Sequence, residues 1–387
     1  MPTSPGPLER LRTANRRAVL SLLATEGALS RADLARATGL SRTTVSNLVA
    51  ELIATGQVVE TSDRGRPHKG GSGRPPLLVA LSPGSGGVAG VDLGHRHVRV
   101  AVADRSGTVL AEEQEAVDVD EDGERALDRA AGLIRRLARR AGLAPADLQA
   151  VGMCVPAPLD RRSLRVSSGI LPGWRGVSPG EELERRVGVP VFADNDANLG
   201  ALAELGRGAA HGAAHVVYVK VASGIGAGIV LGGRLHRGAT GRAGELGHVQ
   251  VGEDGAVCRC GNRGCLETLA AAPRLLEVLQ PAYDEPLTVA RVLALETEGD
   301  AGARRVLSDA GRVIGRALAD LCNSLNPELI VVGGSLGSSA ALREGVRSAV
   351  DRYAQPDTAA AVRVVAAQLG DRAEVVGAVT LATTRVA

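Results

Sequence analysis

The sequence predicts an α/β protein made of a small basic head and a larger body, and three observations lead to this prediction. The chain has 387 residues, too many for one compact core, so two or three domains are expected. Residues 1–75 hold eleven Lys/Arg against six Asp/Glu, whereas the remainder is slightly acidic. Helical spacing dominates the beginning of the chain, and from Val88 strands alternate with helices. A basic segment on an acidic body is typical of a nucleic-acid-binding arm joined to a second unit.

Three short helices are predicted in the head. Apolar residues recur at helical spacing between Pro7 and Gly27. A second helix begins at the capping residue Ser30 and runs to Ala37, before a turn that contains Gly39. Ser41 caps a third helix over 42–54. Two short helices joined by a tight turn with glycine are typical of a helix-turn-helix.

The third helix has an apolar side and a polar side. Its apolar stripe consists of Val45, Leu48, Val49, Leu52 and Ile53. A merely solvated face would carry Glu and Lys, whereas this one carries hydroxyls, Asn and Arg, which can reach base edges and phosphates in a major groove. The predicted DNA-binding residues of this helix are Ser41, Arg42, Thr43, Thr44, Ser46 and Asn47.

Two strands, 58–60 and 77–81, are expected to follow as the strands of a wing. Between them lie Arg64, Arg66 and Arg74 in a Gly/Pro-rich segment. Arginines on a thin, extended loop are suited to a narrow minor groove, so these three are candidate DNA contacts. The same composition is typical of an interdomain linker, and the sequence leaves both interpretations open.

The body begins with a β-β-β-α-β order. The first strand ends in Asp92-Leu93-Gly94, which resembles the phosphate loop of the actin/hexokinase-like ATPase fold. Strands with turns between them, one long helix and a buried strand make up the order. Their expected ranges are 88–93, 98–104, 108–115, 121–141 and 150–155.

Four motifs in the second half extend this resemblance. They are Asp194-Asn195-Asp196-Ala197-Asn198, the run 221–229 that contains Ala222-Ser223-Gly224, Gly244-Glu245-Leu246-Gly247-His248, and the run 258–267. Their order, spacing and residues resemble the ROK family of repressors, open reading frames and sugar kinases. The resemblance covers nearly the whole chain, because repressors of the family carry an N-terminal winged helix-turn-helix.

The resemblance implies a division of the chain. We expect a winged helix-turn-helix domain over 1–82, with a wing or linker at 61–76, and a two-lobed sugar-kinase-like domain over 83–387. The first lobe is expected to hold residues 86–196 together with a C-terminal helix at 373–387, and the second lobe residues 197–372.

Three clustered cysteines predict a metal site. Cys258, Cys260 and Cys265 are close enough for one loop to wrap three thiolates around an ion, and His248 can supply a fourth ligand. Such a closed set is typical of one structural zinc per chain, and the resemblance implies zinc at these residues. Packing of reduced cysteines in a core is the alternative, and it suits Cys154 and Cys322, which lie in apolar segments.

The resemblance also implies a sugar site. In kinases of the family, the residue that matches Asp196 takes a proton from a sugar hydroxyl, and residues that match Asn195, Glu245, His248 and Glu267 hold the other hydroxyls. A zinc-bound His248 would hold this site rigid, with its second ring nitrogen directed at the sugar. The alternative is that these polar groups line an empty cleft.

The nucleotide side departs from the family pattern. Kinases of the family follow Asp-x-Gly with small residues that let the backbone approach phosphates, whereas this chain has His95-Arg96-His97. Ala222-Ser223-Gly224 replaces a Gly-Thr-Gly motif, and Ile170 replaces an Asn before a Leu-Pro-Gly-Trp turn. Phosphoryl transfer depends on nucleotide placement, so no catalytic residue is expected and Asp196 is interpreted as the residual base.

These observations favour a cytoplasmic repressor of carbohydrate-related genes, with a sugar or sugar-phosphate effector. A sugar kinase with a fused DNA-binding head is the alternative. A homodimer or a tetramer is expected, because one recognition helix reads only half of a palindrome. No 18-residue apolar run is present, so membrane insertion is not expected.

Overall fold

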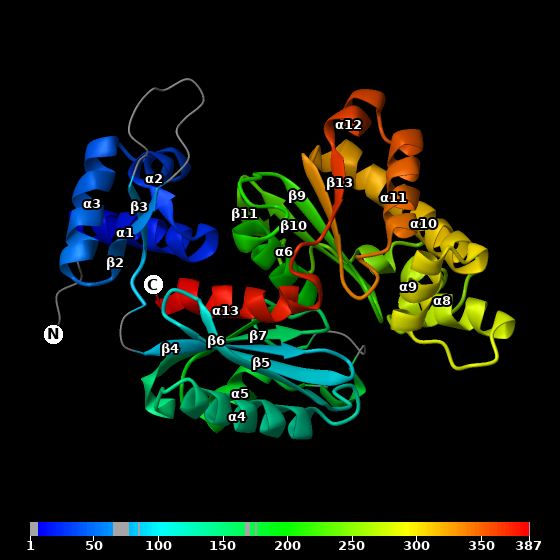
Figure 1. The fold of residues 1–387 in the computed structure, drawn as a ribbon, viewed down its shortest axis with the longest axis horizontal. Coiled ribbons are helices and arrows are strands. Elements are labelled where there is room, and N and C mark those ends of the chain that lie inside the picture. Colours follow the sequence, from blue (N-terminus) through cyan, green and yellow to red (C-terminus); the bar gives the residue numbers. More distant parts are fainter. Residues whose placement is uncertain (1–6, 65–76, 84–85, 167–170, 175, 387) are drawn as a thin grey trace.

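The computed structural model describes residues 7–64, 77–83, 86–166, 171–174 and 176–386. The head folds as a winged helix-turn-helix beside the C-terminal helix of the body (Figure 1). Ser30 and Ser41 cap the second and third helices as predicted, accepting hydrogen bonds from the backbone N–H groups of Asp33 and Thr44. The elements are α1 (Pro7–Glu26), β1 (Leu29–Ser30), α2 (Arg31–Thr38), α3 (Arg42–Ala54), β2 (Val58–Arg64) and β3 (Leu77–Leu81).

The predicted stripe of α3 faces the core of the head. Val45, Leu48, Val49 and Leu52 are buried, and Ile53 is half-buried. The strands form a sheet in the order β1-β3-β2. Two details differ from the prediction: β2 continues to Arg64, and the two-residue strand β1 pairs with β3, which no periodicity in so short a segment could indicate.

The first lobe of the body contains a sheet in the order β6-β5-β4-β7-β8. Helices α4 and α5 cover one face, and α13 lies across the other (Figure 1). The predicted β-β-β-α-β order is confirmed, with boundaries that differ by one or two residues. The bounds are β4 (Gly87–Leu93), β5 (His97–Asp104), β6 (Val109–Ala116), α4 (Gly123–Arg140), β7 (Leu148–Val155), α5 (Pro179–Val187), β8 (Val191–Asn195) and α13 (Ala373–Val386).

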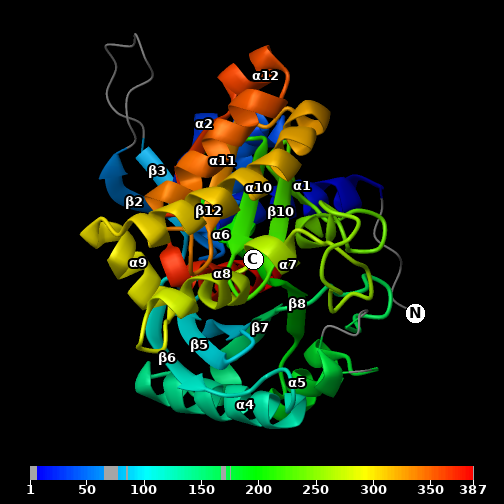
Figure 2. The same cartoon turned by 90° about the vertical axis from the view of Figure 1, so that its right-hand side faces the viewer.

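The second lobe contains another sheet, in the order β11-β10-β9-β12-β13. Figure 2 shows the two lobes one above the other, with α12 at the top, α11 and α10 below it, and α4 at the bottom. The bounds are β9 (Val216–Val221), β10 (Ile225–Leu231), β11 (Arg234–His236), α7 (Glu267–Ala270), α8 (Ala272–Leu279), α9 (Val289–Glu298), α10 (Ala301–Leu325), β12 (Leu329–Gly333), α11 (Ala340–Tyr353), α12 (Pro356–Ala361) and β13 (Arg363–Ala366).

Helix α6 (Asp196–Arg207) connects the three parts of the molecule. It packs against α13 and against β9 and β10 of the second lobe, and α1 of the head packs on both α6 and α13. At its C-terminal end a Cβ atom on Gly206 would lie 2.0 Å from the carbonyl oxygen of Thr25, so only glycine permits this approach. Glu26 lies 3.4 Å from the Nδ1 atom of His211. The head therefore rests directly on the helix that begins at the predicted sugar site.

Among the described residues, no helix combines the length and the apolar character that crossing a membrane requires.

Candidate functional site

Three parallel strands of the first lobe end at one edge of their sheet. The register places Asp92 of β4 beside Cys154 of β7, and Cys154 beside Asp194 of β8. Carboxyl ends of parallel strands are where ligands bind in open α/β sheets, because the loops and helix N-termini that follow them converge there. This edge faces the second lobe across α6 and carries the candidate site.

The residues predicted to bind sugar line one cavity of about 60 Å³. Asn195 and Asp196 lie at the start of α6, Glu245 precedes a single 3₁₀ turn over Leu246–His248, and His248 is the last residue of that turn. Glu267 begins α7. Strand ends and helix starts from both lobes thus bring together residues that are up to 72 positions apart in the sequence.

Asn195 and Asp196 are fixed by the helix that they begin. The Oδ1 atom of Asn195 accepts hydrogen bonds from the backbone N–H groups of Ala197 and Asn198, which leaves its Nδ2 group to donate to a ligand. Asp194 lies behind them and accepts hydrogen bonds from Asn198 Nδ2 at 2.9 Å and from Arg237 Nε at 2.6 Å. The start of α6 is therefore a rigid wall of the cavity.

Lys220 is a site residue that sequence reasoning missed. Its Nζ atom lies 2.9 Å from Asp196 Oδ2 and 3.2 Å from Glu374 Oε1. Burial opposes the charge of this ammonium, but the two carboxylates together raise the pKa of Lys220 well above its ordinary value. A signal was present in the sequence: one of only two lysines in the chain lies in an apolar strand.

The other acidic residues of the cavity differ in their partners. Glu267 accepts a hydrogen bond from the backbone N–H of Ile225 at 3.1 Å and lies 3.6 Å from Nε of Arg259. Burial, together with the charges of Asp196 and Glu267, raises the pKa of Glu245 to about 7. This carboxyl therefore changes its protonation near neutral pH and can both donate to and accept from a hydroxyl.

The loop after β4 is filled by its own side chains. The Nε2 atom of His97 lies 3.0 Å from Oδ2 of buried Asp92, and a Cβ atom on Gly94 would collide with the His97 ring at 2.1 Å. His95 contacts Asp120 through Nδ1 at 2.6 Å, and Arg96 pairs with Asp118. Burial raises the pKa of Asp92, but His97, Lys220 and Cys154 outweigh it and lower the pKa below its ordinary value.

A second cavity of about 340 Å³ lies behind this loop. It shares His95, Pro156, Lys220 and Ser223 with the cavity that the predicted sugar residues line. Ala272, Leu276 and Val289 form part of its apolar wall. Ile170, whose identity departs from the family pattern, lies outside the described residues.

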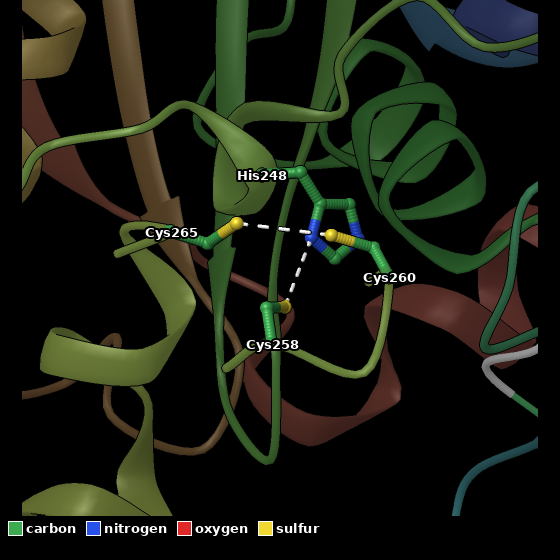
Figure 3. A group of neighbouring side chains, drawn as sticks. All are labelled: His248, Cys258, Cys260 and Cys265. Atoms are coloured by element: carbon green, nitrogen blue, oxygen red, sulfur yellow. Dashed lines mark hydrogen bonds between the residues drawn. The ribbon is translucent and has the colours of Figure 1, made fainter. Parts of the chain in front are cut away.

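The predicted metal ligands form one cluster (Figure 3). One nitrogen or sulfur atom from each of His248, Cys258, Cys260 and Cys265 lies within 4.8 Å of the others. Cys258 Sγ lies 3.6 Å from His248 Nδ1, and Cys260 Sγ lies 3.7 Å from Cys265 Sγ. A disulfide needs about 2.05 Å between sulfurs, so the cysteines are not bonded to one another.

These distances fit a tetrahedral metal site. With zinc–sulfur bonds of about 2.3 Å, two ligands of a tetrahedron lie about 3.8 Å apart. Burial and the neighbouring thiols raise the pKa of Cys265 to about 12, so three thiolates would need a cation to coexist. His248 directs Nδ1 at the cysteines, while its Nε2 atom lies 3.7 Å from Glu245. The cluster and the cavity thus share one imidazole.

The predicted DNA-binding residues of α3 lie together on the head. Ser41, Arg42, Thr43, Ser46 and Asn47 are exposed, and Thr44 is half-buried with its hydroxyl 2.8 Å from that of Ser41. Several of them line an open groove between α1 and α3. Of the wing residues, Arg66 and Arg74 lie outside the described residues, as does the side chain of Arg64.

Two family models match the chain. The model described as the ROK family matches residues 88–385, and the model described as the MarR family matches residues 13–66. The first match covers most of the body, and the second covers the helices of the head and β2.

Known proteins match over most of the chain as well. The chain is 29% identical over 385 residues to a xylose repressor from Caldicellulosiruptor bescii, with 96% of each chain covered. It is 30% identical to a glucokinase from Halalkalibacterium halodurans, over 74% of this chain and 92% of that enzyme. A crystal structure of a ROK family transcriptional regulator, a homolog of the E. coli MLC protein, superposes with a TM-score of 0.77 at 25% identity, covering 97% of each chain.

Proposed function

The chain belongs to the ROK family, and on this premise we propose that it is a DNA-binding transcriptional regulator that responds to a sugar. One observation carries the proposal: the head with its exposed recognition helix rests on α6, whose first residues line the polar cavity. The full-length likeness to a xylose repressor supports repression of carbohydrate-related genes as its output.

In the proposed regulator, residues 1–82 bind operator DNA and residues 83–387 bind the effector. The hydroxyls, amide and guanidinium of α3 contact base edges and phosphates, with Asn47 and Arg42 as the side chains suited to bidentate contacts. A wing with Arg64, Arg66 and Arg74 adds contacts in the minor groove. Two chains form a homodimer and place two recognition helices on a palindrome.

The effector binds among Asn195, Asp196, Glu245, His248 and Glu267, and the protein catalyses no reaction. The side chains of His95 and His97 fill the loop, so a triphosphate cannot approach its backbone N–H groups. The carboxylate of Asp196 forms an ion pair with Lys220 and is not free to take a proton from a hydroxyl. Likeness to a glucokinase makes an ATP-dependent sugar kinase the second candidate. A coupled assay with a monosaccharide panel decides between them. Turnover of about 1–100 per second that disappears in Asp196→Asn contradicts the non-catalytic role.

The Cys₃His cluster holds one structural zinc ion in this proposal. All four positions of a tetrahedral site are taken by protein ligands, so the ion has no open position for a substrate and serves to fix the loop 248–265. Fixing that loop also fixes His248 and, next to it, Glu245 on the wall of the cavity.

Binding of sugar and of operator are coupled through α6. Sugar draws the lobes together around the start of α6, and the displacement reaches α1 at the other end of the same helix. Linkage requires that operator weakens sugar binding by the same factor by which sugar weakens operator binding. Calorimetry of sugar binding with and without saturating operator measures this factor. Sugar affinity that is indifferent to operator contradicts the coupling.

A further inference from the structure

The two cavities of the body meet at a boundary formed by His95, Pro156, Lys220 and Ser223. Asp196 reaches the same boundary through its ion pair with Lys220. A sugar in the cavity therefore presents one of its hydroxyls to His95 and to the Lys220–Asp196 pair. No family match assigns a role to His95, whose counterpart in the family's kinases is a small residue.

The imidazole of His95 is held in one orientation. Its Nδ1 atom lies 2.6 Å from the carboxylate of Asp120, and only 14% of the side chain is exposed. The contact with Asp120 occupies Nδ1, so Nε2 remains to form a hydrogen bond with a hydroxyl, which can both donate and accept. Because His95 lines the cavity, its Nε2 atom is the ring nitrogen available to a ligand.

The charges around the boundary are unsuited to a phosphate group. Lys220 is paired with Asp196 and Glu374. His97 is paired with Asp92, as His95 is with Asp120.

Four carboxylates thus surround one ammonium and two imidazoles among the described residues at this boundary. The two guanidinium groups that line the cavities are also close to carboxylates: Arg259 lies 3.6 Å from Glu267, and Arg96 pairs with Asp118. Each of these bases already has an acidic partner. A phosphate monoester carries about two negative charges near neutral pH and would add to this excess. Like charges brought together in a partly buried site oppose binding.

We propose that the cavity binds an uncharged, unphosphorylated monosaccharide and that His95 is the residue that contacts the hydroxyl facing the second cavity. This inference rests on the proposed sugar-responsive function and narrows it to one ligand class. The loop after β4, which holds phosphates in kinases of the family, here contacts a sugar hydroxyl through His95. Asp120 is the positioning residue that orients the His95 ring.

Matched ligand pairs test the ligand class. The full-length protein is screened by thermal shift against D-glucose, N-acetyl-D-mannosamine and other hexoses, each paired with its 6-phosphate, and calorimetry gives the affinities of hits. We expect a free hexose to bind at least about 100-fold more tightly than its ester. A 6-phosphate that binds as tightly as the free sugar, or more tightly, overturns the inference but leaves a sugar-responsive regulator intact. Binding of no sugar and no ester, with operator binding retained, contradicts both.

Variants test the role of His95. His95→Ala should weaken the hexose hit by about threefold to tenfold, the loss expected for one hydrogen bond. The matched control is Arg96→Ala: this neighbour has a side chain 77% exposed, lines only the second cavity and should leave hexose affinity unchanged.

A deoxy analogue of the hexose hit that lacks the hydroxyl facing the second cavity separates contact from general structural damage. His95→Ala should not weaken the analogue further, because the hydroxyl that His95 reads is already missing. Asp120→Asn should reproduce part of the loss for the hexose and none for the analogue. Equal losses for hexose and analogue in His95→Ala would show that His95 only supports the fold of the loop.

Discussion

Lys220 has two carboxylate partners from different parts of the chain, Asp196 on α6 and Glu374 on α13. A buried ion pair adds little net stability compared with apolar residues, because both charges lose their hydration. Removing only one partner is costly, because the remaining charge stays buried without a counterion. Lys220 thus connects the helix at the polar cavity with the C-terminal helix.

Lys220→Met should therefore lower the free energy of unfolding by about 3–5 kcal/mol, since it leaves two carboxylates unpaired. Urea denaturation followed by circular dichroism measures this loss. The double variant Lys220→Met/Asp196→Asn, which removes one of the unpaired charges, should regain part of it. A single variant as stable as the native protein would be inconsistent with a buried ion-paired triad.

Cys260 tests the metal cluster. Cys260→Ser removes one of four ligands, so zinc measured by mass spectrometry after dialysis against a weak chelator should fall from about one per chain to well below one. The sugar response should weaken before operator binding does, because His248 is both a proposed metal ligand and part of the cavity wall.

Cys322→Ala is the matched control, because Cys322 is buried in α10 away from the cluster and should leave zinc content unchanged. Retention of one tightly held zinc in Cys260→Ser, or an unaltered sugar response in the zinc-free protein, would argue against these roles.

At the scale of the element, helix α6 contacts both lobes of the body and the head. Its first residues face the cavity, Glu204 lies in its C-terminal half, and its end supports α1 of the head. Buried Glu204 accepts hydrogen bonds from the backbone N–H groups of Gln368 and Leu369, in the segment between β13 and α13 where the chain returns to the first lobe. A displacement of α6 is therefore transmitted both to that crossover and to the head.

Gly206→Ala should disturb the contact through which α6 transmits a displacement to α1 of the head. The added Cβ would meet the Thr25 carbonyl oxygen at 2.0 Å, so α1 and α6 must move apart. We expect the sugar-dependent change in operator affinity to shrink at least about threefold, while sugar binding alone stays within about twofold, because the substitution lies ten residues from Asp196. Fluorescence anisotropy of labelled operator with increasing sugar measures the change.

Gly132→Ala in α4 is the control for this substitution. A Cβ there meets nothing within 4 Å, so the variant should keep full coupling and gain roughly 0.5–1 kcal/mol of helix stability. Normal induction in Gly206→Ala, equal to that of Gly132→Ala, would rule out the α1–α6 contact as the route.

At the scale of the whole molecule, the two heads of the proposed homodimer predict a palindromic operator. Half-sites should be centred about 34–36 Å apart or a multiple of this distance, one or more turns of DNA. Footprinting should show two symmetric protected segments, and a single half-site should bind at least about 100-fold more weakly. A monomer in light scattering that binds one half-site at full affinity would contradict this assembly.

Local chemistry determined much of this protein. The caps at Ser30 and Ser41 and the apolar stripe of α3 set the helices of the head, since caps and 3.6-residue periodicity act within one or two turns. The cluster of His248 with three cysteines was equally predictable, because its ligands lie on one continuous stretch of chain. The ROK family and the two-part fold also followed from motifs in the sequence.

Tertiary structure alone decided which charges meet. Lys220 and Glu374 are 154 positions apart, and His95 reaches Asp120 only because the chain returns past the loop after β4. The approach of Thr25 to Gly206 likewise depends on how two separately folded parts dock. No local periodicity encodes such pairings, because they arise from packing of elements that are distant in sequence.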